Sequence, residues 1–85
     1  MEGWTEMTEL NDLLKYIAKA MVDNPEQVEI SEIEGSQATI LGLKVAKSDL
    51  GMVIGKHGKN ANAIRTLIHA ASAKTRKRIT IEILE

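Results

Sequence analysis

The chain has 85 residues, no cysteine, one tryptophan, one tyrosine and a formal net charge of −1 at neutral pH. This length supports one small hydrophobic core and no second domain. Without cysteine there is no disulfide framework, thiolate nucleophile or cysteine-based zinc site, and His57 and His69 alone cannot complete a metal shell. We find neither a membrane span nor an export signal, and a small disulfide-free domain fits the cytosol, so a cytoplasmic protein is expected.

The small net charge hides a strong separation of charge along the chain. Residues 1–34 carry two lysines against nine acids, a net charge of −7, whereas residues 44–78 carry nine basic residues against one acid, a net charge of +8. A basic half favours a localised anion-binding face, because a polyanion responds to the nearby field more than to the total charge. A solvated surface of mixed charge is the alternative explanation.

The N-terminal part predicts a lead-in and then a helix. Residues 1–7 show no pattern and are predicted to be flexible, so the folded domain covers residues 8–85. Thr8 is the predicted N-cap, and the helix ends at Asp23-Asn24-Pro25, since proline disfavours a helical residue before it. The apolar residues of this helix follow a spacing of three and four: Leu10, Leu13, Leu14, Ile17, Ala18, Met21 and Val22.

A hairpin and a short helix are predicted next. The run from about residue 28 to 33 alternates in hydrophobicity, and Glu34-Gly35-Ser36 supplies a turn. In the following strand, one face carries Thr39, Leu41, Leu43 and Val45. Ser48 is then the predicted N-cap of a helix over 49–54, which stops at Gly55.

The C-terminal part predicts a longer helix over about 60–74, residues 75–78 as a connection, and a strand in which Ile79, Ile81 and Ile83 alternate with polar residues. The buried stripe of the helix is predicted to be Ala61, Ile64, Leu67, Ile68 and Ala71. The order α-β-β-α-α-β predicts an α+β fold, a three-stranded mixed sheet covered on one face by three helices.

One segment has the composition of a ligand-binding loop: Val53-Ile54-Gly55-Lys56-His57-Gly58-Lys59. Two glycines spaced by two residues allow a tight reversal with positive φ and let a ligand backbone approach closely. The N-terminus of the next helix favours a phosphate, and Lys56 and Lys59 add positive charge. The segment therefore predicts a phosphodiester site, whereas an ordinary helix-helix connection is the structural alternative.

Other phosphate motifs and catalytic sites fit less well. Residues 51–57 are one residue short of a P-loop and have His57 where Ser or Thr would hold magnesium. The first glycine pair of a dinucleotide-binding fingerprint is absent, and no triad or carboxylate pair is placed with any specificity, so we predict no enzyme and no cofactor. A DNA-binding helix-turn-helix over 49–74 is disfavoured, because the helix pair is framed by strands.

The chain resembles the type II KH domain, whose V-I-G-x-x-G-[KR] motif matches Val53 to Lys59. It is further similar to the small stand-alone bacterial KH proteins of the KhpA family over roughly residues 8 to 85. The phrases that carry this similarity are Tyr16-Ile17-Ala18-Lys19-Ala20, Val22-Asp23-Asn24-Pro25-Glu26, Gly51 to Gly58, Ala63-Ile64-Arg65-Thr66 and Lys77-Arg78-Ile79. The chain departs from that pattern in its extra N-terminal residues and in His57, where related loops often carry glutamine.

The resemblance implies that the loop clamps the backbone of about four single-stranded RNA nucleotides while an aliphatic groove holds the bases. No aromatic platform for stacking is expected, since the chain has no phenylalanine and its two aromatic residues, Trp4 and Tyr16, lie near the acidic N-terminal segment. The floor of the groove is assigned to Val53, Ile54, Ile64 and the last strand around Ile79 and Ile81, although each also fits the core. The predicted RNA-binding residues are Val53, Ile54, Gly55, Lys56, His57, Gly58, Lys59, Ile64, Arg65 and Arg78.

The alternative explanation for Lys59, Arg65 and Arg78 is that they are solvated surface residues with no contact to RNA. His69, outside this set, is predicted to be a surface or packing residue. Because a bound phosphate would favour the protonated form of His57, binding is expected to strengthen as the pH falls.

The resemblance also implies partners. Proteins similar to KhpA self-associate, pair with a larger multidomain KH protein of the KhpB or Jag type, and act as RNA chaperones or post-transcriptional regulators linked to cell shape. Linking two weak sites raises avidity without a new contact at either site. A protein-protein adaptor with little RNA binding of its own is the alternative from another functional class. No membrane and no small-molecule substrate is expected.

Overall fold

A computed structural model describes residues 2–74 and 78–84. Its helices and strands are α1 (Glu2–Met21), β1 (Glu29–Glu34), β2 (Ala38–Lys44), α2 (Leu50–Ile54), α3 (Lys59–Ala71) and β3 (Arg78–Leu84). Short 3-10 turns flank them at Pro25–Gln27, Lys47–Asp49, Lys56–Gly58 and Ser72–Lys74. The order confirms the predicted α-β-β-α-α-β succession.

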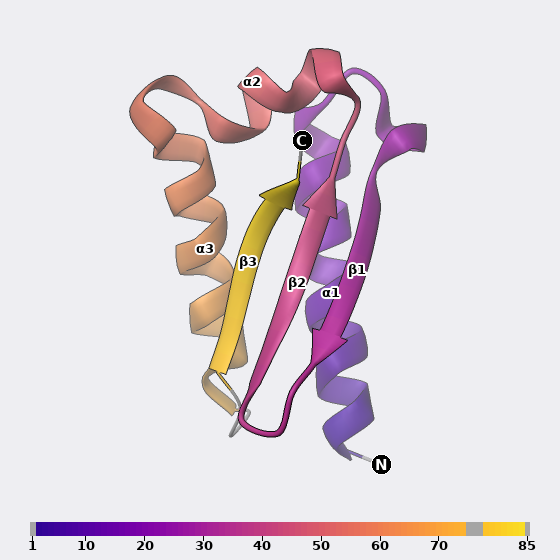
Figure 1. The fold of residues 1–85 in the computed structure, drawn as a ribbon, viewed down its shortest axis with the longest axis vertical. Helices are drawn as coiled ribbons and strands as arrows, with labels where there is room; N and C mark the ends of the chain where they lie inside the picture. The colour runs from indigo at the N-terminus through magenta and orange to yellow at the C-terminus, as the bar shows by residue number, and fades with distance from the viewer. Residues whose placement is uncertain (1, 75–77, 85) are drawn as a thin grey trace.

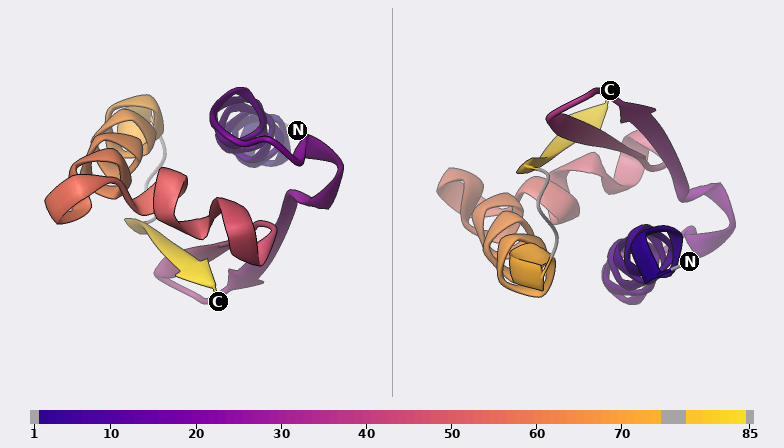
Figure 2. Two further views of the ribbon diagram at one scale, coloured as in Figure 1. Left: turned by 90° about the horizontal axis from the view of Figure 1, so that it is seen from above. Right: turned by 90° about the horizontal axis from the view of Figure 1, so that it is seen from below.

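The sheet has β2 at its centre, because β2 pairs with both other strands (Figure 1). It runs antiparallel to β1, with Glu29 opposite Lys44, and parallel to β3, with Ala38 opposite Arg78. Helices α1 and α3 lie side by side against one face of the sheet, as the two end-on views in Figure 2 show. The predicted mixed sheet with helices on one face is therefore confirmed.

The core lies between this face and the helices, because alternate strand residues point toward them. The four side chains that were predicted to share one face of the second strand are all buried: Thr39, Leu41, Leu43 and Val45. The buried core cluster is Leu10, Leu14, Ala18, Val28, Leu41, Leu43, Val45, Val53, Ile64, Ile68, Ile79 and Ile81. None of the described helices covers the opposite face of the sheet (Figure 2), and Ile33 in β1 is 64% exposed.

Three local predictions are corrected. Helix α1 begins at Glu2, so Thr8 lies inside the helix and does not cap it. Met7 lies three residues before Leu10 and keeps the apolar spacing, and extending a formed helix costs little per residue. Ser48 lies within the 3-10 turn and does not cap α2. The buried stripe of α3 comprises only Ala61, Ile64 and Ile68, so Leu67, which is 52% exposed, and Ala71, which is also exposed, do not belong to it.

Two other predictions are not tested by these elements. Residues 75–77, predicted to lead into the last strand, lie outside the described residues. The division into a flexible lead-in over 1–7 and a folded domain over 8–85 stays a prediction.

The charge separation of the sequence becomes a separation in space. The acidic segments form α1 and β1, whereas the described cations of the basic half lie at the end of β2, in the turns on either side of α2, on α3 and at the start of β3. Because β1 and β3 lie at opposite edges of the sheet and α3 lies beyond β3, the cations of α3 lie on the side of the molecule away from β1 (Figure 1).

Candidate nucleic-acid interface

The loop between α2 and α3 has an unusual backbone. Gly55 and Gly58 both have a φ of 75°, and His57 between them has a φ of 58°. Within the described part of the chain these are the only residues with positive φ. Positive φ at the glycines was predicted from their spacing, but the left-handed conformation of His57 was not. A non-glycine residue in this conformation is uncommon and is typical of ligand-binding loops.

Hydrogen bonds fix the shape of this loop. The N–H of Gly55 donates to the carbonyl of Gly51 at 2.8 Å, and the N–H of Gly58 donates to the carbonyl of Gly55 at 3.1 Å. The side-chain amide of Asn60, in the first turn of α3, donates to the carbonyl of Met52 in α2 at 2.7 Å. These hydrogen bonds connect the loop to both of the helices that flank it.

The two glycines of the motif serve different purposes. A Cβ on Gly55 would lie 2.7 Å from Cγ of Asn60, so the close packing of the loop excludes a side chain there. A Cβ on Gly58 would meet no heavy atom within 4 Å. Gly58 thus satisfies a backbone requirement and leaves open space, which a ligand backbone can occupy.

Three cationic or titratable residues lie next to Gly58 in the chain. Lys56 and His57 lie in the loop and Lys59 begins α3, and all three are exposed. The amino end of α3 adds the positive end of its dipole. This arrangement can hold an anion that approaches from solvent.

The predicted floor of the base groove is mostly core. Val53, Ile64, Ile79 and Ile81 are each at most 3% exposed, whereas Ile54 at the end of α2 is 38% exposed. This burial favours the core alternative for the first four residues. Ile54 is the one member of the predicted floor with open apolar surface.

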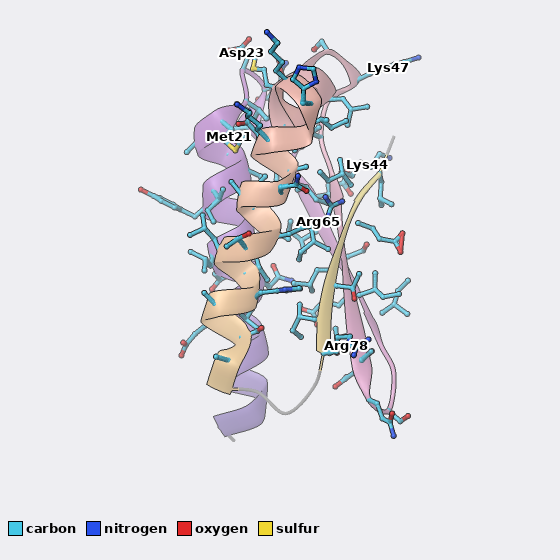
Figure 3. The ribbon with its side chains drawn as sticks, turned by 90° about the vertical axis from the view of Figure 1, so that its left-hand side faces the viewer. Met21, Asp23, Lys44, Lys47, Arg65 and Arg78 are labelled. Carbon is cyan, nitrogen blue, oxygen red and sulfur yellow. The ribbon has the colours of Figure 1, made fainter. Side chains whose placement is uncertain are left out.

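The remaining predicted residues lie along the seam between α3 and β3. The Nε–H of Arg65 donates to the carbonyl of Ile81 at 3.4 Å, and Nε2 of His69 lies 3.0 Å from the carbonyl of Ile79. Arg65 points from the middle of α3 toward β3, while Arg78 lies at the far end of β3 (Figure 3). The structure therefore brings Lys56, His57 and Lys59 together and places Arg78 well away from them.

A buried carboxylate anchors α2 on the side away from the loop. Asp49 is 1% exposed and accepts hydrogen bonds from the N–H of Asp23 at 3.3 Å and from the N–H and side-chain amide of Asn24 at 3.0 and 3.1 Å. These bonds tie the turn after α1 to the start of α2, and so fix the helix that leads into the loop. The bonds join residues 25 or more positions apart, which the sequence does not indicate.

The described residues include neither a cluster of metal-binding side chains nor a helix that could span a membrane. Among residues 2–74 and 78–84, no group of three histidine, cysteine or acidic side chains is placed to hold a metal ion. In the same residues, none of the helices combines the length and the apolar character that a membrane span requires.

With the motif and its geometry established, the family follows from comparison. The profile of the family described as "KhpA/KhpB, KH domain" matches residues 11–83. The chain belongs to this family. The match includes the glycine loop, α3 and most of β3, so the loop described above is the GxxG loop of a KH domain.

Several relatives of this family are similar over most of the chain. RNA-binding protein KhpA of Caldanaerobacter subterraneus subsp. tengcongensis is 55% identical over 75 residues, which are 88% of this chain and the whole of that protein. RNA-binding protein KhpA of Clostridium acetobutylicum is 52% identical over 75 residues, which are again 88% of this chain and the whole of that protein. That of Aquifex aeolicus is 43% identical over 79 residues, 93% of this chain and the whole of the relative. No solved structure matches significantly.

Proposed function

We propose that this chain binds single-stranded RNA and holds the sugar-phosphate backbone on its GxxG loop. The observation that carries the proposal is the loop itself: a fixed left-handed reversal with exposed Lys56 and His57 beside open space at Gly58. Membership of the KhpA/KhpB family supports it, since the relatives are named RNA-binding proteins. A KH domain clamps about four nucleotides in this manner.

The roles of the site residues follow from their positions. Gly55 and Gly58 shape the loop, while Lys56, His57 and Lys59 contact phosphate as exposed charge-bearing side chains. Arg65 lies beside the β3 edge, within reach of a base or of the next phosphate. Ile54 offers apolar surface to a base, whereas Val53 and Ile64 are buried.

A single clamp of this kind binds weakly and depends on salt, because its affinity comes largely from a few phosphate contacts. The proposal therefore includes a second copy or a larger KH protein of the KhpB type as partner, and a role as RNA chaperone or post-transcriptional regulator. Pairing would bring two clamps onto one strand and raise the avidity. The family description, which joins KhpA with KhpB, supports this choice of partner.

A protein-protein adaptor is the second candidate. It is favoured by the exposed apolar side chains Ile33 and Leu67, which are 64% and 52% exposed and lie on opposite sides of the molecule, one on the open sheet face and one on α3. In that case the loop would bind RNA weakly or not at all without the partner.

The test is fluorescence anisotropy of a labelled single-stranded RNA pool with the wild type and the variant Lys56→Asp/His57→Asp. Aspartate tolerates the left-handed conformation of residue 57 better than most residues, so the variant keeps the loop shape. The matched control is Lys47→Asp/Ser48→Asp, which makes the same change in charge in exposed residues at the other end of α2. Circular dichroism verifies both folds, and duplex DNA serves as competitor.

We expect the loop variant to bind RNA at least about tenfold more weakly, while the control stays within about twofold of the wild type. Equal affinity of the loop variant and the wild type refutes the clamp. If the wild type shows no RNA binding up to high micromolar protein, the adaptor function replaces this one.

A further inference from the structure

The two edges of the sheet differ in what borders them. β3 forms one edge, and side chains of α3 reach its carbonyls: the Nε–H of Arg65 donates to the carbonyl of Ile81 at 3.4 Å. Nε2 of His69 lies 3.0 Å from the carbonyl of Ile79. β1 forms the other edge, and no described strand lies beyond it (Figure 1). The sheet therefore has one edge bordered by side chains and one open edge.

The hydrogen bonds of the hairpin show which backbone groups β1 directs outward. The N–H of Gly35 donates to the carbonyl of Ala38 at 2.7 Å, so these residues form a bonded pair beside the turn. Bonded and non-bonded pairs alternate along an antiparallel ladder. Glu32 and Ile30 lie three and five residues before Gly35, so both occupy non-bonded positions. Their N–H and C=O groups therefore point away from β2, and none of the backbone hydrogen bonds between described segments reaches them.

The backbone of β1 is ready to pair with another strand. Natural edge strands often carry proline, lysine or a β-bulge, each of which hinders such pairing. β1 contains neither proline nor lysine, and its residues Glu29–Glu34 pair one to one with β2 without a bulge. Every side chain of the strand is exposed except that of Ile30, which is half-buried. A further strand can thus add to this edge without a rearrangement of the sheet.

The charges of β1 favour a basic partner. The strand carries Glu29, Glu32 and Glu34 and no cation. Glu29 lies opposite Lys44 on β2, whereas the residue opposite Glu32 is uncharged. The carboxylate of Glu32 accepts a hydrogen bond from the neutral amide of Asn11 at 2.8 Å, which orients the group and leaves its charge. Two copies of β1 side by side would bring glutamates together, so the edge disfavours a second copy and favours a strand with cations.

Ile33 adds an apolar contact on the other face of the strand. Its side chain is 64% exposed on the open face of the sheet, opposite the half-buried Ile40. Successive side chains of a strand point to opposite faces. A strand beside β1 would therefore place an apolar residue next to Ile33 and cations next to Glu32 on the helix side. The sequence that fits this edge alternates basic and apolar residues.

We propose that β1 is a docking edge for a protein partner, which adds an extended segment of alternating basic and apolar residues as a fourth strand of the sheet. Backbone hydrogen bonds to Ile30 and Glu32 give the affinity, and the glutamates and Ile33 give the specificity. Because β1 and α3 lie on opposite sides of the molecule, a partner bound here leaves the GxxG loop open (Figure 1). The proposal does not rest on the function of that loop.

The test uses the full chain and a labelled, end-blocked peptide of about eight residues that alternates lysine and valine, long enough to cover β1. One matched peptide is N-methylated at its central residues, which keeps the charges and removes the donors of both edges. A second has glutamate in place of lysine. Fluorescence anisotropy measures the affinities, and nuclear magnetic resonance follows the amide signals of Ile30 and Glu32.

Four variants separate the charge from the backbone. Glu32→Lys reverses the charge at the edge, and Glu82→Lys makes the same change in an exposed residue of β3 at the other edge. Glu32→Pro removes an outward N–H without breaking a bond to β2, and Glu32→Gln is its control because it removes the charge alone. Circular dichroism verifies the folds. Should Glu32→Pro fail to fold, the N-methylated peptide tests the same backbone bonds.

We expect the N-methylated and glutamate peptides to bind at least about tenfold more weakly than the lysine–valine peptide. Glu32→Lys should weaken binding of that peptide about fivefold, while Glu82→Lys stays within about twofold of the wild type. Glu32→Pro should bind more weakly than Glu32→Gln. The amide protons of Ile30 and Glu32 should exchange more slowly with the peptide bound, while the signals of Gly55 and Gly58 stay unchanged.

Three results overturn the proposal. Equal binding of the N-methylated peptide would show attraction by charge without strand addition, and equal binding of the glutamate peptide would refute a basic partner. Unchanged exchange at Ile30 and Glu32 would place the peptide elsewhere on the molecule. If these amides are already protected in the free chain and its sedimentation depends on concentration, a second copy occupies the edge instead. None of these results affects the test of the RNA clamp, which uses the loop variant.

Discussion

The anchor at Asp49 allows a quantitative test of how this fold holds the loop helix in place. Asp49→Ala removes the acceptor of three hydrogen bonds and leaves two backbone N–H groups and one side-chain amide without their partner. Each loss costs about 1 kcal/mol, at the lower end of the usual range, because Asp23 is exposed and Asn24 is half-buried and water can replace part of the bonding. The free energy of unfolding should fall by about 3 kcal/mol, which lowers the melting temperature by about 12 to 24 °C in a domain of this size.

Urea denaturation and thermal melting by circular dichroism measure this effect. Asp49→Asn, which retains one acceptor oxygen, should lie between Asp49→Ala and the wild type. Asp12→Ala, on the exposed side of α1, is the control and should change stability by less than about 0.5 kcal/mol. If Asp49→Ala is as stable as the wild type, the cost of burying the carboxylate equals the value of its bonds and the anchor adds no stability.

Two further predictions concern the core and the loop. The Thr39 hydroxyl is buried with no hydrogen-bond partner among the described residues, so Thr39→Val should raise the free energy of unfolding by about 1 kcal/mol in urea denaturation, and a decrease would contradict this. In the loop and the helix before it, replacing Gly51, Gly58 or Gly55 with alanine should give melting temperatures that decrease in that order. Gly51→Ala is neutral or stabilising in α2, Gly58→Ala costs about 1 kcal/mol through its positive φ, and Gly55→Ala costs more because it also displaces Asn60; any other order contradicts the assigned roles.

Much of the fold could be predicted because the sequence repeats local signals. The three- and four-residue spacing of Leu10, Leu14 and Ala18 predicts the buried side of α1, and the alternation of Thr39, Leu41 and Leu43 predicts the core face of β2. The helix start was wrong by seven residues, since a candidate cap such as Thr8 is only one way to begin a helix. The prediction that Leu67 is buried was wrong, because the buried stripe of α3 is narrower than the apolar pattern of its sequence.

The site was predictable in its loop and not in its surroundings. The GxxG spacing and the flanking lysines indicate a backbone reversal with nearby charge, and the structure has that reversal at Gly55 and Gly58. The left-handed His57 and the bond from Asn60 to Met52 were missed, since a histidine or an asparagine at these positions has several conformations of similar energy until both helices are in place. The contacts of Arg65 and His69 with the carbonyls of β3 were also missed, because the sequence does not show which way these side chains point.

The sequence by itself determined the elements, the family and the loop that reverses the chain, because these depend on residues within a few positions of one another. Only the tertiary structure decided that Asp49 closes on Asn24, that Val53 and Ile64 are core, and that Arg78 lies across a cleft from His69 instead of beside the loop. These are contacts between segments far apart in the chain. They form only when β3 pairs in parallel with β2 and brings its first residue to the end of α3, and no local pattern specifies that meeting point.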